Sequence, residues 1–77
     1  MWRAQLEVEL RCAEERIAQG EQHLARQAAL VAKLERLGLA DETAAKTLDA
    51  LRRSQALFVE ERDRLRRTLE SLGPAAS

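Results

Sequence analysis

The fold is decided by a short stretch in the middle of the chain, LERLGLADE, residues 34–42. Gly38 suits the left-handed backbone conformation that follows a helix end, and Leu39 is placed to fold back onto the last turn. Asp41 suits an N-cap, whose carboxylate accepts hydrogen bonds from the first amides of a new helix. The stretch therefore predicts a turn over residues 38–41, between a helix over 2–37 and a helix over 42–72.

Outward from this turn, apolar residues recur in steps of three and four, the spacing of a coiled-coil seam. The stripe before the turn is Leu10, Ala13, Ile17, Gly20, Leu24, Gln27, Val31 and Leu34. The stripe after it is Leu48, Leu51, Gln55, Phe58, Arg62, Leu65, Leu69 and Leu72. Gly73 and Pro74 then end the second helix, and we expect a frayed tail over 73–77. The predicted fold is all-α, one antiparallel two-helix coiled-coil hairpin spanning 1–77.

Reversing the second stripe against the first gives eight pairs whose residue numbers share one total. The pairs are Leu34 with Leu48, Val31 with Leu51, Gln27 with Gln55, Leu24 with Phe58, Gly20 with Arg62, Ile17 with Leu65, Ala13 with Leu69 and Leu10 with Leu72. The matched Gln27 and Gln55 are predicted to form a polar layer that sets the register. Charges beside the seam agree with this topology. On one edge Glu14, Glu21 and Glu35 face Arg52 and Arg66, and on the other edge Arg16 and His23 face Glu61.

Gly20 opposite Arg62 is the one break in the apolar seam, and two interpretations apply. The functional interpretation is a notch with a guanidinium at its base, able to accept a carboxylate from a partner. The structural interpretation is that glycine makes room for the Arg62 stem while its charge reaches Glu21 or Glu61. The second is favoured because carboxylates are available within the chain.

A two-helix hairpin buries little apolar surface, and chains this short commonly add disulfides, metal or self-association. Leu30 and Leu37 on the first helix, with Ala50 and Leu57 on the second, project to one side of the seam. On the other side, Ala28, Ala45 and their neighbours form a small-residue surface. The sequence therefore predicts a homo-oligomer, with Leu30, Leu37, Ala50 and Leu57 as the self-association residues and a four-helix bundle as the simplest product. The alternative is that these leucines are scattered exposed residues, which are ordinary on protein surfaces.

Composition limits the classes of partner. Thirteen basic residues balance thirteen acidic ones, so no net field favours nucleic acid or an anionic membrane. The first residues lack the apolar run of a secretory signal, no stretch is apolar enough to span a bilayer, and Cys12 has no second cysteine to pair with. We expect a cytoplasmic protein without cofactor.

Candidate catalytic residues are few. Cys12 and His23 are three helical turns apart and cannot share a metal, and no phosphate loop or nucleophile with a base at useful spacing is present. The run RDRLRR, residues 62–67, with Arg52 and Arg53 upstream, is the strongest signal for nucleic acid, although acidic residues interleave with it. The sequence predicts a non-enzymatic protein with no metal site.

Three stretches resemble a group of short, uncharacterised bacterial proteins: GEQHLARQ at 20–27, LER at 34–36 and ALFVEERDRL at 56–65. That group often has a histidine where this chain has Phe58, and a Gly-His-Asp-Thr turn where this chain has Gly38 to Asp41. The resemblance covers about two thirds of the chain and implies a helical hairpin of bacterial, cytoplasmic origin. It implies no activity, because none is established for the group.

Two function classes follow. The first is a small interaction or scaffold protein that self-associates and binds another helical protein. The second is a nucleic-acid-associated regulatory protein that uses the arginine-rich second helix. Only the second predicts that binding falls steeply with added salt.

Overall fold

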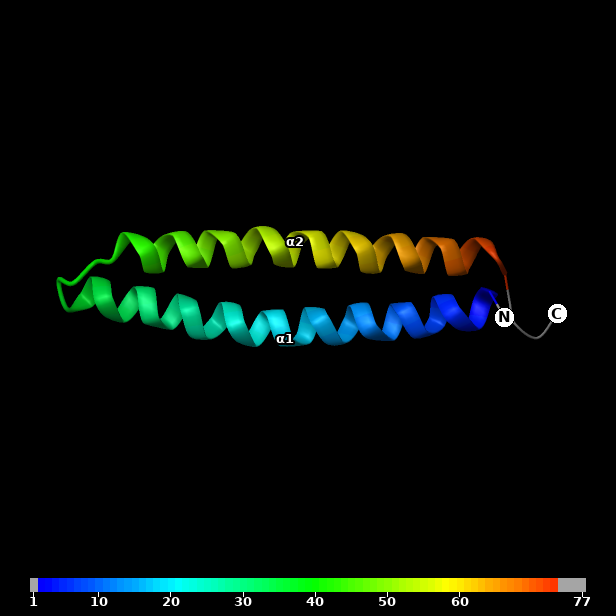
Figure 1. Ribbon diagram of the computed structural model, residues 1–77, viewed down its shortest axis with the longest axis horizontal. Helices are drawn as coiled ribbons and strands as arrows, with labels where there is room; N and C mark the ends of the chain where they lie inside the picture. Colours follow the sequence, from blue (N-terminus) through cyan, green and yellow to red (C-terminus); the bar gives the residue numbers. More distant parts are fainter. Residues whose placement is uncertain (1, 74–77) are drawn as a thin grey trace.

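The computed structural model describes residues 2–73 as two antiparallel α-helices joined by one short connection (Figure 1). Helix α1 spans Trp2–Arg36 and helix α2 spans Glu42–Ser71. Together they form a rod of 61 × 14 × 14 Å, with both described ends at the same end of the rod. The all-α hairpin topology predicted from the sequence is confirmed. Each helix ends one residue before its predicted end, and residues 74–77 of the predicted tail lie outside the described residues.

The connection is built by two local signals. Gly38 adopts φ 72°, the Leu39 amide donates to the Leu34 carbonyl at 2.8 Å, and the Gly38 amide donates to the Glu35 carbonyl at 3.1 Å. These two bonds are the Schellman pattern, which satisfies the last carbonyls of a helix. The predicted left-handed glycine is confirmed, although Leu39 remains largely exposed.

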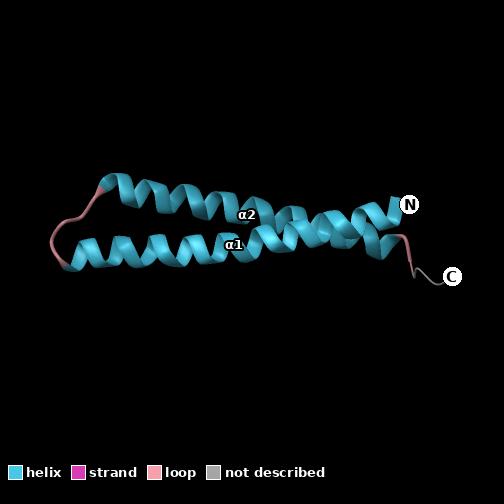
Figure 2. Ribbon diagram, turned by 60° about the horizontal axis from the view of Figure 1, so that its bottom comes forward, coloured by secondary structure: helices cyan, strands magenta, loops and turns pink. Residues whose placement is uncertain are grey.

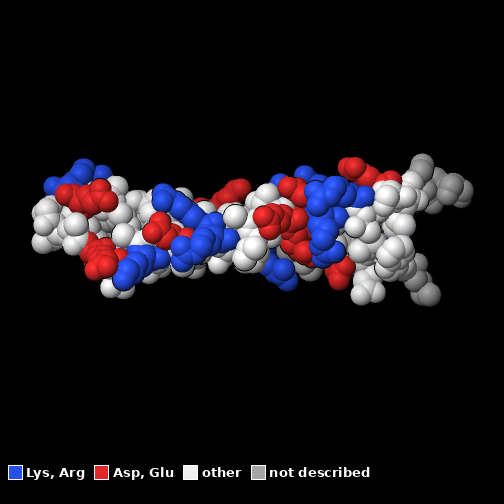
Figure 3. All heavy atoms as spheres, turned by 90° about the horizontal axis from the view of Figure 1, so that it is seen from above, with Lys and Arg blue, Asp and Glu red and all other residues white. Residues whose placement is uncertain are grey.

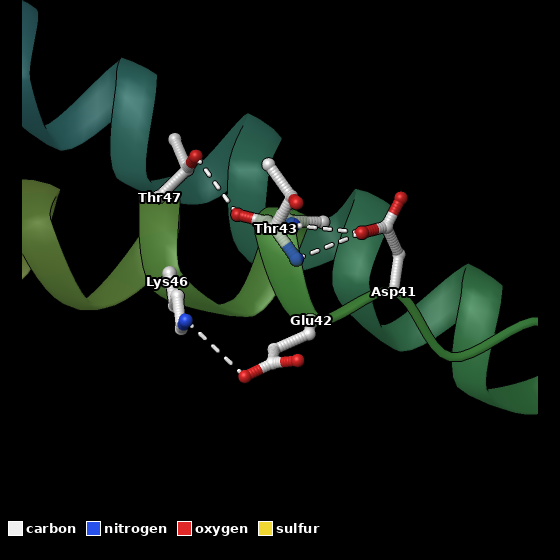
Figure 4. A network of polar contacts seen from close by, with 6 residues as sticks. Asp41, Glu42, Thr43, Lys46 and Thr47 are labelled. Atoms are coloured by element: carbon white, nitrogen blue, oxygen red, sulfur yellow. Dashed lines mark hydrogen bonds and ion pairs between the residues drawn. The ribbon is translucent and has the colours of Figure 1, made fainter.

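The start of α2 is closed by its N-cap, shown in Figure 4. Asp41 Oδ1 accepts hydrogen bonds from the Thr43 amide at 2.8 Å and the Ala44 amide at 3.3 Å, as the sequence predicted. Lys46 pairs with Glu42 at 3.2 Å, and the Thr47 hydroxyl donates to the Thr43 carbonyl at 3.0 Å. The side chain of Asp41 therefore fixes the residue at which α2 begins, because it binds amides of the first turn that have no partner within the helix.

The helices lie side by side in Figure 1 and cross in the rotated view of Figure 2, so they wind around one another. The buried residues are all apolar and lie along the seam: Leu6, Ala13, Ile17, Ala44, Leu48 and Leu65. Leu6, Ala13 and Leu65 form one cluster, against which Leu10 and Leu69 pack. The tightest part of the core thus lies near the terminal end of the rod.

The predicted pairing of the two stripes is wrong by one heptad. Gly20 lies against Gln55, not against Arg62, which is seven positions further along α2. Leu65 belongs to the cluster with Leu6 and Ala13, where the sequence had paired it with Ile17. The same residues still face the seam, because a shift of seven keeps every side chain on its own face.

The two registers place the helix ends differently at the turn. Residues 37–41 alone lie between the helices, α2 starts beside the last turns of α1, and α1 projects beyond it at the turn end (Figure 1). The predicted register would have left the first turn of α2 projecting beyond α1. The observed register also buries Leu6 and Ala44, two apolar residues outside the predicted stripes.

Candidate interaction surface

The side of the hairpin that carries Leu30, Leu37, Ala50 and Leu57 is called here the leucine flank. All four residues are exposed, Leu30 by 44%, Leu37 by 60% and Leu57 by 63%. They therefore lie outside the seam within the chain, which is where the sequence placed them. Exposed leucines that share one side of a thin rod form a candidate contact surface.

A furrow runs between the helices along this flank. Near its middle it is lined by His23, Leu51, Ser54 and Phe58. Toward the turn it continues between Leu30 and Thr47, with His23 and Leu51 shared by the two sections. The floor is thus apolar in its middle, and the two walls come from different helices.

The opposite side is called here the alanine flank, and it is narrower. Ala28, Ala32 and Ala45 line a shallow hollow there, together with Glu35, Asp49 and Arg52. Nearer the terminal end, Arg66 pairs with Glu14 across the helices at 3.1 Å, the cross-helix pair expected from the sequence. Charged side chains border the small residues on this flank, as Arg16 and Arg26 border the furrow on the leucine flank.

The notch predicted at Gly20 is filled from within the chain. Gln55 Nε2 donates to the Ile17 carbonyl at 2.8 Å, and its Oε1 is buried without a hydrogen-bond partner among the described residues. A Cβ built on Gly20 would meet the Gln55 side chain, with its Cδ at 2.8 Å. The absence of a Cβ at Gly20 lets the Gln55 amide lie against the backbone of α1.

Arg62 does not line this notch. Its Nη2 lies 3.1 Å from Asp63 Oδ1, and its Nε donates to the same oxygen. The sequence had assigned the charge to Glu21 or Glu61, and the neighbouring carboxylate takes it instead because the register moves Arg62 one heptad away from Gly20. Neither a carboxylate-binding notch nor a Gly20–Arg62 contact is formed.

The predicted side-by-side contact of Gln27 with Gln55 is also wrong. Gln27 Nε2 donates to the Ala44 carbonyl at 3.0 Å, while Gln55 bonds to Ile17. Each glutamine thus binds the backbone of the opposite helix at a separate level of the seam. Both amides still bridge the helices, so a role in setting register stays a prediction for each residue separately.

The arginines of α2 are largely occupied by carboxylates. Besides Arg62 and Arg66, Arg64 pairs with Glu61 at 2.6 Å and Arg52 lies 3.8 Å from Asp49. The hydrogen bonds and the charge of Glu61 raise the pKa of the Arg64 guanidinium above its ordinary value. Figure 3 shows basic and acidic side chains interleaved along one face of the rod. This mixture is unlike the concentrated positive charge of a phosphate-binding surface.

The two side chains that could act as a nucleophile or a base, Cys12 and His23, do not lie together. Cys12 is an exposed thiol, and His23 lines the furrow beside Ser54, while Glu61 lines the neighbouring hollow with Arg16. Within residues 2–73, no group of three or more histidine, cysteine or acidic side chains is placed to hold a metal ion. Over the same residues, neither helix combines the length and apolar character needed to cross a membrane.

Comparisons of the chain with protein-family models, with curated proteins and with solved structures find no match. The resemblance to bacterial hairpin proteins therefore stays a prediction from the sequence. Leu6, Ala44 and the Gly20–Gln55 contact are the features that sequence reasoning missed. The signal that could have found them is that Leu6 and Ala44 each continue one stripe by a further step, and only the observed register gives both of them a partner on the opposite helix.

Proposed function

We propose that this protein is a small non-enzymatic interaction module, which self-associates through its leucine flank and presents its remaining helix surface to another helical protein. The observation that carries the proposal is the exposure of Leu30, Leu37 and Leu57 on one side of a rod with only six buried residues among those described. Covering that side would bury apolar surface where the hairpin itself has little. The proposed setting is the bacterial cytoplasm.

The test is oligomer mass measured against dilution, by sedimentation or light scattering, with far-ultraviolet circular dichroism on the same samples. Leu30→Glu combined with Leu57→Glu should lower the mass and the helix content together, because folding and association are linked by mass action. Leu39→Glu is the matched control, since Leu39 is equally exposed but lies in the connection. A fully helical monomer that is insensitive to dilution and to the double change would contradict the proposal.

Binding to nucleic acid is the second candidate, supported by Arg53 and Arg67, which have no ion-pair partner within residues 2–73. Retention on a nucleic-acid column at rising salt separates the two candidates. Binding through phosphates should fall steeply with salt, whereas an apolar contact between copies should persist.

A further inference from the structure

We infer that the leucine flank binds a second copy of this chain in antiparallel orientation, with α2 of one copy against α2 of the other. The contact centres between Ala50 and Ser54. This inference rests on the proposed self-association and adds to it the helix that forms the contact and the direction in which the copies run.

The choice of α2 follows from the charge pattern. Along the leucine flank, α2 carries four successive uncharged positions, Thr47, Ala50, Ser54 and Leu57. The corresponding run on α1, from Gln19 through His23 and Arg26 to Leu30, is interrupted by the charge of Arg26. A helix contact core is depleted in charge, so the α2 stripe is the better centre for a contact.

The stripe on α2 is symmetric enough to pack against a second copy of itself that runs in the opposite direction. Its steps of three, four and three residues read the same in both directions, so two antiparallel copies place Leu57 against Thr47 and Ala50 against Ser54. The Thr47 hydroxyl is already bonded to the Thr43 carbonyl, which leaves its methyl group for contact. Small residues at the centre let the helix axes approach closely, and the two leucines close the contact at its ends.

Charges beside the stripe support the same arrangement. In antiparallel pairing, Lys46 of one copy lies beside Glu60 of the other, twice per dimer. Glu60 has no ion-pair partner among the described residues, and the Lys46 ammonium, which pairs with the exposed Glu42 of its own helix, keeps further donors for a second carboxylate. Arg53 comes near Arg53 of the second copy across the two-fold axis, the one unfavourable meeting of like charges. This geometry therefore predicts that removing a charge at one site strengthens the dimer.

Site-directed disulfides test the direction of the copies. In a Cys12→Ser background, a Thr47→Cys chain mixed with a Leu57→Cys chain should give a disulfide-linked dimer under mild oxidation. Either chain alone should give little, because two equivalent residues in this arrangement lie about 15 Å apart along the axis, ten residues at 1.5 Å each. Equal cross-linking of each chain alone, or no cross-linking in a mixture whose mass is dimeric, would overturn the antiparallel α2 contact while self-association stood.

The dissociation constant tests the same geometry without cysteine chemistry. Leu57→Ala should raise it about tenfold or more, since each dimer loses two buried leucines. Arg53→Gln should lower it about two- to fivefold by removing the like-charge contact, whereas Arg67→Gln, at the equivalent heptad position beyond the stripe, should leave it unchanged. An unchanged constant for Arg53→Gln would refute the proposed axis, and a protein that stays monomeric throughout would refute the proposed function as well.

Discussion

Helix α1 packs differently before and after Gly20. Before it, Leu6, Ala13 and Ile17 are buried, and the larger cluster forms with Leu65 from α2. After it, α1 has no buried residue up to Arg36, and its seam residues are only half-buried. The heptad spacing is the same in both parts, so the spacing alone does not make a core.

The difference lies in what α2 presents to each part of α1. The terminal part meets Leu65 and Leu69, whereas the part near the turn meets Ala44 and Leu48, and the Ala44 carbonyl also accepts the Gln27 amide. The small side chain of Ala44 and the polar bridge from Gln27 leave this part of α1 less covered, although Ala44 and Leu48 are themselves buried. The part of α1 near the turn is therefore less buried than the part near the termini, where Leu6, Ala13 and Leu65 form one cluster.

The largest expected effect separates these two regions. Leu65→Ala removes a side chain that is 3% exposed and should lower the free energy of unfolding by about 3 kcal/mol. Leu34→Ala, at a half-buried seam position near the turn, should cost about 1 kcal/mol. Urea unfolding followed by circular dichroism at one protein concentration measures both. Equal losses would mean that the two parts of α1 are packed alike.

A second prediction concerns Gly20, where the two parts of α1 meet. It tests the energetic coupling between substitutions at Gly20 and at Gln55. Gly20→Ala should change stability little in the native sequence, because the gain of about 1 kcal/mol in helix propensity is offset by displacing the Gln55 amide. In a Gln55→Ala background the same change should stabilise the protein by the full amount, about 1 kcal/mol.

Arg62→Ala provides the matched background for this cycle. In the observed register Arg62 is remote from Gly20, so the Gly20→Ala effect should be the same with and without Arg62. Coupling of Gly20 to Arg62 in place of Gln55 would mean that the helices pair in the register predicted from the stripes.

The sequence predicts the topology and the connection well because both rest on local chemistry. Gly38 and Asp41 act within a few residues of themselves, and the apolar steps identify the face of each helix. The register is harder, because every heptad presents leucine or a similar side chain and a shift of seven preserves the face. The burial of Leu6 and Ala44 and the contact of Gln55 with Gly20 are what distinguish the two registers.

The candidate surface was predictable in part for the same reason. Leu30, Leu37 and Leu57 are exposed because their heptad positions lie beside the seam in either register. The Gly20 notch and the glutamine layer depend on which residues meet across the seam, so one shift changed both. A contact between helices cannot be read from the face of each helix alone.

A third prediction concerns the two amides that bridge the regions. Replacing both Gln27 and Gln55 by Leu should raise the free energy of unfolding by about 0.5–1 kcal/mol, since apolar burial outweighs two bonds to carbonyls already used in helices. It should also make the register less specific, which would appear as faster hydrogen exchange of the backbone amides near Gly20. A lower melting temperature would mean that the amides stabilise the seam more than leucines can.

The smallest expected effect is that of the ion pair between Arg66 and Glu14, which joins the helices on the alanine flank at 3.1 Å. Both side chains are about half exposed, so solvent screens the pair and a double-mutant cycle with Arg66→Ala and Glu14→Ala should give below about 1 kcal/mol. The coupling should shrink further in 1 M salt, where the screening length is about 3 Å. Because this pair lies beside the buried cluster of Leu6, Ala13 and Leu65, we expect it to favour the antiparallel orientation of the helices while contributing little to the stability of the core. A coupling that is large and independent of salt would show instead that the terminal region relies on charge as much as on the Leu6, Ala13 and Leu65 cluster.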